Sequence, residues 1–195
     1  MGNREDLLAG ARRVIVEQGV ARATAREIAS AAGVSLAAIG YHFGSKEQLI
    51  TEALTQSLGS GLGDEMEEVV AAHAEEPFLE GFAALWNRMP EVFTAHRETL
   101  LASLENAARA LRSDDGARGL AEATAHGHQG VADALRAARP ELSDADVEAV
   151  AKLDYALAQS LGLLWLLSPD AVPTGDELAR AVAVIAKTGA APASE

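Results

Sequence analysis

Cysteine is absent from this sequence of 195 residues, so disulfide bonds, thiol catalysis and thiolate metal sites are excluded together. Aromatic residues are scarce, at 4% of the chain, although 49% of the residues are hydrophobic and alanine and leucine dominate. Unbranched side chains lose little rotamer freedom in a helix, so this composition favours helices over strands. The apolar content is sufficient for a substantial core.

The sequence also lacks an apolar leader and a long uninterrupted hydrophobic run. Residues 2–6 are polar, charged or glycine, unlike the start of a signal peptide. The longest nearly apolar run, 153–167, contains Asp154 and Gln159, and it predicts a segment too short and too interrupted to cross a bilayer. We therefore expect a cytoplasmic protein with no membrane partner.

Positive charge is scarce overall, since the net charge is −13. Such a chain is poorly suited to nucleic acid, because phosphate contacts need cations. The acidity is unevenly distributed, however. Residues 1–50 carry six basic and five acidic side chains, whereas residues 51–195 carry ten basic and twenty-four acidic ones. This asymmetry indicates two regions with different roles, the first of them close to neutral.

Helical patterns begin near the N-terminus. Apolar residues recur at helical spacing from residue 7 onward and predict a first helix that ends at Gly19. Residues 24–27, Thr-Ala-Arg-Glu, have the pattern of a capping box and predict the start of a second helix. Gly33 can adopt the positive φ of a tight turn. Ser35 is then expected to cap a short third helix over residues 36–41.

A fourth helix follows the third. Gly44 is expected to end the third helix, and residues 45–48, Ser-Lys-Glu-Gln, form a second capping-box sequence. Two short helices joined by a glycine-containing turn, with a helix on each side, are typical of a helix-turn-helix. An ordinary three-helix bundle that binds nothing has the same spacing, so spacing alone leaves both interpretations open.

The rest of the sequence is also helical in pattern, with no strand-like alternation and no repeat period. The predicted fold is therefore all-α, with three helices and the start of a fourth in residues 1–50 and a second helical region in residues 51–195. Later helices are expected over residues 78–94, 97–112, 117–139, 144–167 and 175–187.

One of these helices is unlike the others, because from residue 153 to residue 167 it is apolar almost all round. A helix on the surface of a monomer needs a polar face, so this helix needs cover on a second side. We expect a pair of helices from a second copy to supply it in a two-fold four-helix interface, with burial inside one chain as the alternative. The residues assigned to this interface are Leu153, Leu157, Ser160, Leu161 and Leu164.

The first fifty residues resemble the tetracycline-repressor (TetR) family of bacterial regulators. The resemblance rests on the order and spacing of residues in three stretches, 24–29, 31–35 and 41–49, and covers about a quarter of the chain. It implies a homodimer that binds a palindromic operator in double-stranded DNA. It also implies a three-helix helix-turn-helix head at residues 1–50 and a helical ligand-binding and dimerisation domain at residues 51–195. A small-molecule effector bound in that second domain is expected to release the DNA.

The predicted head offers contacts for DNA phosphates. Helix N-termini at Thr24, Ser35 and Ser45 would present backbone N–H groups and partial positive charge to phosphate oxygens. The resemblance implies phosphate contacts at the positions of Thr24, Tyr41, His42 and Lys46.

The predicted recognition helix departs from the family pattern. Leu36, Ala37 and Ala38 have no side-chain hydrogen bond for a base edge and can read only thymine methyls or DNA shape. Gly40 stands where the family often has tyrosine. Arg26 is then the best candidate for reading guanine, with a phosphate contact or a surface pair with Ser30 as the alternatives. The residues assigned to DNA are Thr24, Arg26, Ser35, Leu36, Ala37, Ala38, Gly40, Tyr41, His42 and Lys46.

An effector pocket in the second domain should be mostly apolar with a few polar groups. Plain core packing is the favoured alternative for Phe82, Met89 and Leu104, and the polar candidates can equally be exposed. The candidates, all in helices expected to surround a cavity, are Phe82, Trp86, Met89, Phe93, Leu104, Glu105, Asn106, His126 and Tyr155.

Catalysis is disfavoured by the residues present. His126 and His128 are two residues apart, so on a helix they point in different directions. The acidic stretch 144–148 lacks the glycine and the length of a calcium loop, and no phosphate-binding loop, dinucleotide fingerprint or nucleophile elbow is present. We expect no enzyme, no cofactor and no metal site. A helical adaptor that binds another protein is the alternative function, and the acidic surface suits it.

Overall fold

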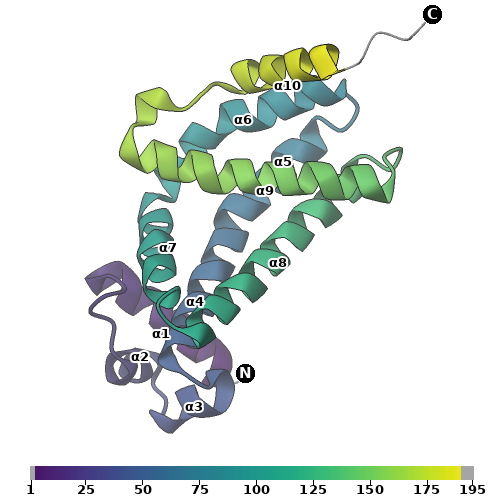
Figure 1. Cartoon of the computed structure of the whole chain (residues 1–195). Coiled ribbons are helices and arrows are strands. Elements are labelled where there is room, and N and C mark those ends of the chain that lie inside the picture. The colour runs from purple at the N-terminus through teal and green to yellow at the C-terminus, as the bar shows by residue number, and fades with distance from the viewer. Residues whose placement is uncertain (1–2, 190–195) are drawn as a thin grey trace, which may run out of the picture. The chain divides into compact units, whose positions relative to one another are not determined.

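The structure, a computed structural model, describes residues 3–189, and over that range the chain is helical and has no strand (Figure 1). The predicted all-α fold is confirmed. In chain order the elements are α1 (Asn3–Gln18), α2 (Ala25–Ala32), α3 (Ala37–Phe43), α4 (Lys46–Leu58), the π-helical turn η1 (Gly59–Gly63), α5 (Asp64–Ala72), α6 (Phe78–Ala95), α7 (Arg97–Ala110), α8 (Asp114–Ala138), α9 (Asp144–Leu167), the 3-10 turn η2 (Pro169–Ala171) and α10 (Gly175–Gly189).

The described residues form two compact units. The first unit consists of residues 3–63 and 96–130, and the second of residues 64–95 and 131–189. Helix α8 therefore contributes to both. The expected functional division at residue 50 stays a prediction, and helix α4 runs across that position.

The core of the first unit is formed by the apolar faces of α1 to α4. Leu7, Leu8, Ile28 and Leu49 are completely buried in it. Helices α1 and α2 approach so closely at Gly10 that a Cβ atom there would lie 2.9 Å from two backbone atoms, Ile28 O and Ala32 N. Because real Cβ atoms do not come that near to backbone, the crossing requires glycine.

Side-chain caps determine where α2 and α4 begin. The Thr24 hydroxyl accepts a hydrogen bond from the Glu27 N–H at 3.2 Å, and the Thr24 N–H donates to Glu27 Oε2 at 3.1 Å, which confirms the capping box. The Ser45 hydroxyl likewise accepts from the Gln48 N–H at 3.1 Å. Both side chains satisfy N–H groups that the first helical turn leaves without partners.

The expected cap at Ser35 is wrong. Helix α3 begins after Leu36, which already has helical dihedral angles and makes no side-chain cap. Ser35 contributes its backbone carbonyl instead, which accepts from the Ala38 N–H at 3.0 Å. A serine cap needs an extended residue directly before the helix, and here the chain turns into α3 too early for that geometry.

The core of the second unit is formed largely by α6. Phe82, Leu85, Trp86 and Met89 are buried along one face of this helix. Helix α10 packs beside α6 (Figure 1), where a Cβ atom at Gly175 would lie 1.9 Å from the Ala83 carbonyl oxygen. A second cluster joins the end of α8 to the start of α9 through Ala132, Leu135, Val147 and Ala151.

Helix α9 corrects one expectation about the apolar run at 153–167. The helix has 24 residues and a stretch with a mean hydropathy of 1.2, so by length and composition it could cross a membrane. The sequence analysis expected this segment to be too short to cross a bilayer. That expectation is wrong, because the helix that contains the segment begins upstream at Asp144. Core helices of soluble proteins pass the same test, and α9 contributes Val147 and Ala151 to the core of the second unit.

Candidate DNA-binding surface and ligand cavity

The surface of the helix-turn-helix is carried by one face of α3. Leu36, Ala37, Gly40 and Tyr41 are exposed, and Tyr41 is 85% exposed. Gly40 lies four residues after Leu36, and Tyr41 lies four residues after Ala37. Residues at that spacing are neighbours on a helix, so the four positions share one side of α3. Gly33, with φ of +68°, makes the turn that holds α3 beside α2. The structure therefore presents a single exposed face between Leu36 and Tyr41.

Ala38 does not belong to that face. It is buried in the core of the first unit together with Ile39 and Phe43. In a helix this short the inward positions hold it to the rest of the head, so the expected base contact at Ala38 is replaced by a packing role.

Arg26 lies in the first turn of α2 and is exposed. Among residues 3–189 its side chain has no hydrogen bond or ion pair, so the expected alternative of a surface pair with Ser30 is not formed. Its guanidinium is therefore available to a ligand outside the chain.

Lys46 and His42 are more enclosed. The Lys46 ammonium donates to the Ala23 carbonyl oxygen at 3.2 Å and pairs with Glu47 at 3.6 Å. The His42 ring is half-buried and stands edge-on to Tyr41, with 4.8 Å between ring centroids. Lys46 thus joins the start of α4 to the loop before α2, where Thr24 caps that helix.

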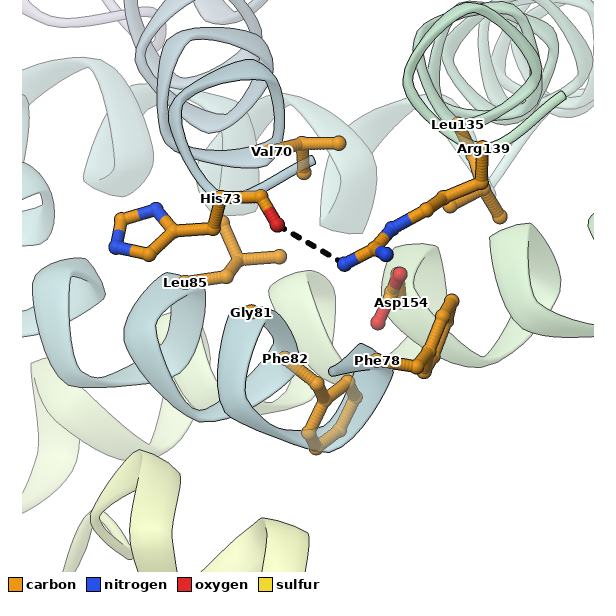
Figure 2. Close-up of a pocket in the computed structure, with 9 residues that line it drawn as sticks. All are labelled: Val70, His73, Phe78, Gly81, Phe82, Leu85, Leu135, Arg139 and Asp154. Carbon is orange, nitrogen blue, oxygen red and sulfur yellow. Dashed lines mark hydrogen bonds between the residues drawn. The ribbon is translucent and has the colours of Figure 1, made fainter. Parts of the chain in front are cut away.

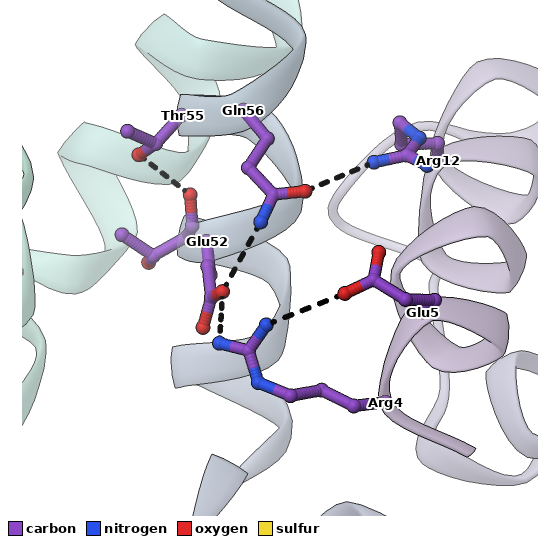
Figure 3. A network of polar contacts seen from close by, with 7 residues as sticks. Arg4, Glu5, Arg12, Glu52, Thr55 and Gln56 are labelled. Carbon is purple, nitrogen blue, oxygen red and sulfur yellow. Dashed lines mark hydrogen bonds and ion pairs between the residues drawn. The ribbon is translucent and has the colours of Figure 1, made fainter. Parts of the chain in front are cut away.

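A polar network between α1 and α4 was not predicted from the sequence (Figure 3). Arg4 pairs with Glu52 and stacks over the Phe43 ring at 5.1 Å. Gln56 donates to Glu52 at 3.3 Å and accepts from Arg12 at 3.4 Å. These contacts hold α4 to α1, and Arg4 also reaches α3 through Phe43. No local motif marks the two pairs that join the helices, Arg4 with Glu52 and Arg12 with Gln56, since their members are more than forty residues apart.

A buried hydrogen bond joins α4 to α7 within the first unit. The Asn106 side-chain amide donates to the Thr51 hydroxyl at 3.0 Å, and both side chains are buried. Asn106, expected to line an effector pocket, is therefore committed to helix packing.

The remaining expected pocket residues fall into different surroundings. Leu104 is 42% exposed, because α7 turns Ala102, Asn106 and Ala110 towards the core instead. Glu105 is exposed and lines a pocket of about 330 Å³ in the first unit, between α1, α4 and α7.

The other candidates do not line that pocket. His126 is exposed, Tyr155 is half-buried, and the packed core of the second unit holds Trp86, Met89 and Phe93.

A cavity does lie in the second unit, and of the expected residues only Phe82 lines it (Figure 2). Its volume is about 30 Å³, enough for about one water molecule. The wall is apolar apart from three residues that can carry charge, His73, Arg139 and Asp154. The complete lining is Val70, His73, Phe78, Gly81, Phe82, Leu85, Leu135, Arg139 and Asp154.

Asp154 is the unusual group of this cavity. Its side chain is 6% exposed, and its Oδ1 atom has no hydrogen-bond partner among the described residues. Burial raises the pKa of Asp154 to about 7, and the neighbouring Trp86 side chain acts in the opposite direction. The sequence carries one signal of this site, the single carboxylate within the apolar run 153–167, which the sequence interpretation treated only as an interruption.

The exposed helix-turn-helix on an all-α chain defines a class, the helix-turn-helix regulators. Residues 7–53 match the sequence model of the bacterial regulatory proteins of the tetR family. BetI of Rhizobium meliloti, an HTH-type transcriptional regulator, is 42% identical over 69 residues, which are 35% of this chain and 34% of BetI. AcnR of Corynebacterium efficiens, an HTH-type transcriptional repressor, is 45% identical over 49 residues, which are 25% of this chain and 26% of AcnR.

These curated relatives are matched over about a third of their length or less. The crystal structure of the multidrug binding protein EbrR with imidazole is similar over 100% of this chain and 98% of that one, with 27% identity and a TM-score of 0.64. Residues 7–53 thus carry the DNA-binding domain of the tetR-family regulators, and the whole chain has the fold of a solved multidrug binding protein.

Proposed function

We propose that the protein is a transcriptional repressor that binds a palindromic operator as a homodimer and leaves it when a small-molecule effector binds. The observation that carries the proposal is α3, which is held to the core by Ala38, Ile39 and Phe43 while its other face, from Leu36 to Tyr41, is exposed. A helix of this kind enters the major groove, and its neighbours contact the phosphates. The cytoplasm, where the DNA lies, is the expected location.

The proposed contacts with DNA are of two kinds: contacts with phosphates position the protein, and contacts with base edges read the sequence. The capped N-termini of α2 and α4 direct N–H groups to phosphates, and Tyr41 and His42 donate hydrogen bonds to them. Lys46 supplies positive charge beside the α4 N-terminus. Arg26 reads guanine, and the apolar face of α3 reads thymine methyls and shape.

A second copy is proposed to cover α9 and α10. Leu153 and Ser160 are exposed, and Leu157 and Leu164 are half-buried. These four side chains are therefore accessible to a second chain. Leu161 is buried within the second unit and so faces the core instead. Leu167 of α9 and Val184 and Ile185 of α10 are also exposed, by 74%, 52% and 70%. This surface suits a self-complementary two-fold interface.

The effector is proposed to be a largely apolar small molecule bound in the second unit. EbrR, the structural relative, is a multidrug binding protein crystallised with imidazole and, in another structure, with ethidium. A helical adaptor for another protein is the competing function, and only the acidic surface favours it.

Selection of bound sequences from random double-stranded DNA tests the proposal. We expect a palindrome to be enriched and two chains to bind each duplex. Affinity for it should fall roughly a hundredfold between 50 and 200 mM salt if about four phosphates are neutralised. An adaptor would enrich no sequence and would show no salt-dependent affinity for DNA.

Arg26→Ala is expected to relax base preference at one position in each half-site. The loss on the operator should be roughly 1–3 kcal/mol, because a bidentate contact to guanine disappears. Repeating the selection with the variant measures the change. Arg22→Ala is the matched control, since Arg22 is also exposed in the head but donates to the Gln18 carbonyl oxygen at 2.9 Å. Equal weakening on operator and random DNA would assign Arg26 to a phosphate.

A further inference from the structure

We propose that the cavity of the second unit binds the effector, and that its ligand is a small aromatic molecule with a cationic nitrogen that pairs with Asp154. The inference rests on the proposed function in one respect, that the ligand acts as an effector. Binding of the ligand to the cavity does not itself require DNA. The site combines an acidic group that has no ion pair among the described residues with aromatic walls in one pocket (Figure 2).

The first argument concerns the buried carboxyl. Asp154 lines the cavity from α9, and its Oδ1 atom is buried without a hydrogen-bond partner among the described residues. The neighbouring Trp86 side chain lowers the pKa of the carboxyl, but its buried Nε1 atom also has no hydrogen-bond partner among those residues. A carboxylate removed from water is strongly disfavoured unless it is paired and hydrogen-bonded. A ligand with a cationic N–H group would satisfy both needs at once.

The second argument concerns Arg139, the cation that shares the cavity. Its Nη2 atom donates to the His73 carbonyl oxygen at 2.9 Å, and its guanidinium stacks over the Phe78 ring at 5.6 Å. Its Nη1 atom lies 3.9 Å from Glu141, and within residues 3–189 it has no ion pair with Asp154. Arg139 is thus held by other partners, and the acidic group is left for a ligand.

The third argument concerns the walls and the surroundings. Phe78 and Phe82 border the cavity and can receive an aromatic ring or face a cation. Residues 51–195 carry twenty-four acidic and ten basic side chains, so the field around this part of the chain attracts cations. In this structure the cavity has room for about one water molecule, so the half-buried side chains of His73, Phe78 and Arg139 must move to admit the ligand.

Three probes with the same ring and different charge test the inference: benzamidine, a cation, benzamide, which is neutral, and benzoate, an anion. Calorimetric titration of the full chain without DNA at pH 8 should show benzamidine binding at least tenfold more tightly than the other two. Asp154→Asn should remove that preference. Asp170→Asn, which deletes the same charge at an exposed site in the second unit, should bind like the wild type.

The pH dependence gives an independent measurement in the wild type. A cation must displace the proton of Asp154, so affinity for benzamidine should rise between pH 6 and pH 8 and then level off. His73, Arg139 and Glu141 are the other charged or titratable groups beside the cavity, and they remain in Asp154→Asn. That variant should therefore lose the rise.

Several outcomes would overturn the inference. They are equal binding of the three probes, preference for benzoate, no binding of any probe at millimolar concentration, or unchanged preference in Asp154→Asn. Preference for benzoate would assign the cavity to an anion paired with Arg139. If benzamidine binds through Asp154 but leaves a preformed operator complex intact, the ligand site stands and the proposed release mechanism fails.

Discussion

Asp154→Asn is expected to be more stable than the wild type at pH 8, although it removes a charge from the chain. The pKa of Asp154 is raised from 3.8 to about 7 by burial, so between these values the folded state holds a proton that the unfolded state has lost. Stability then falls as pH rises, by about 1.4 kcal/mol per pH unit, until the folded pKa is passed. Asparagine has no proton to lose.

Urea unfolding at pH 5, 6, 7 and 8 measures this difference. Relative to Asp154→Asn, the wild type should lose roughly 2–3 kcal/mol between pH 5 and pH 7 and little more beyond it. Subtracting the two curves removes the contributions of His73 and Arg139, which border the same cavity in both proteins. Asp170→Asn should follow the wild type. Parallel curves for wild type and Asp154→Asn would show that the carboxyl is already ionised at pH 5.

Gly10→Ala and Gly40→Ala are expected to change stability in opposite directions. The new Cβ at residue 10 would lie 2.9 Å from Ile28 O and Ala32 N, and backbone atoms cannot rotate away as a side chain can. We expect a loss of about 1–3 kcal/mol as α1 and α2 are forced apart. At Gly40 nothing lies within 4 Å, so alanine gains about 0.5–1 kcal/mol of helix propensity.

Thermal unfolding of the two variants beside the wild type checks this pair, with circular dichroism to follow the helices. The midpoint should fall for Gly10→Ala and rise slightly for Gly40→Ala. A fall for both would mean that Gly40 is needed for the conformation of α3. If Gly40→Ala is more stable but binds the operator less well, its missing side chain serves the approach to DNA.

Helix starts were predicted best where a single local motif determines them. The hydroxyls of Thr24 and Ser45 each accept a hydrogen bond from the N–H three residues later, as the two capping-box sequences predict. The start of α3 was predicted less well, because Leu36 is already helical and the cap motif needs an extended residue.

The two candidate sites also differ in how far the sequence could predict them. The DNA-facing surface lies within about twenty-five consecutive residues, so its motif can be recognised without tertiary structure. The cavity is lined from α5, α6, α8 and α9, and no local pattern tells which faces of distant helices meet. Leu104 illustrates the limit: helical periodicity placed it inward, whereas the buried bond of Asn106 to Thr51 turns another face of α7 to the core.

The exposed apolar surface on α9 and α10 also bears on how much of this protein a cell can maintain. A chain that leaves Leu167 and Ile185 open to water is a target for aggregation and proteolysis while it is alone. Association stabilises by mass action, so freshly made chains should survive longer as their number grows. We expect turnover to slow with abundance, which would set a lower limit on the copy number at which the regulator persists.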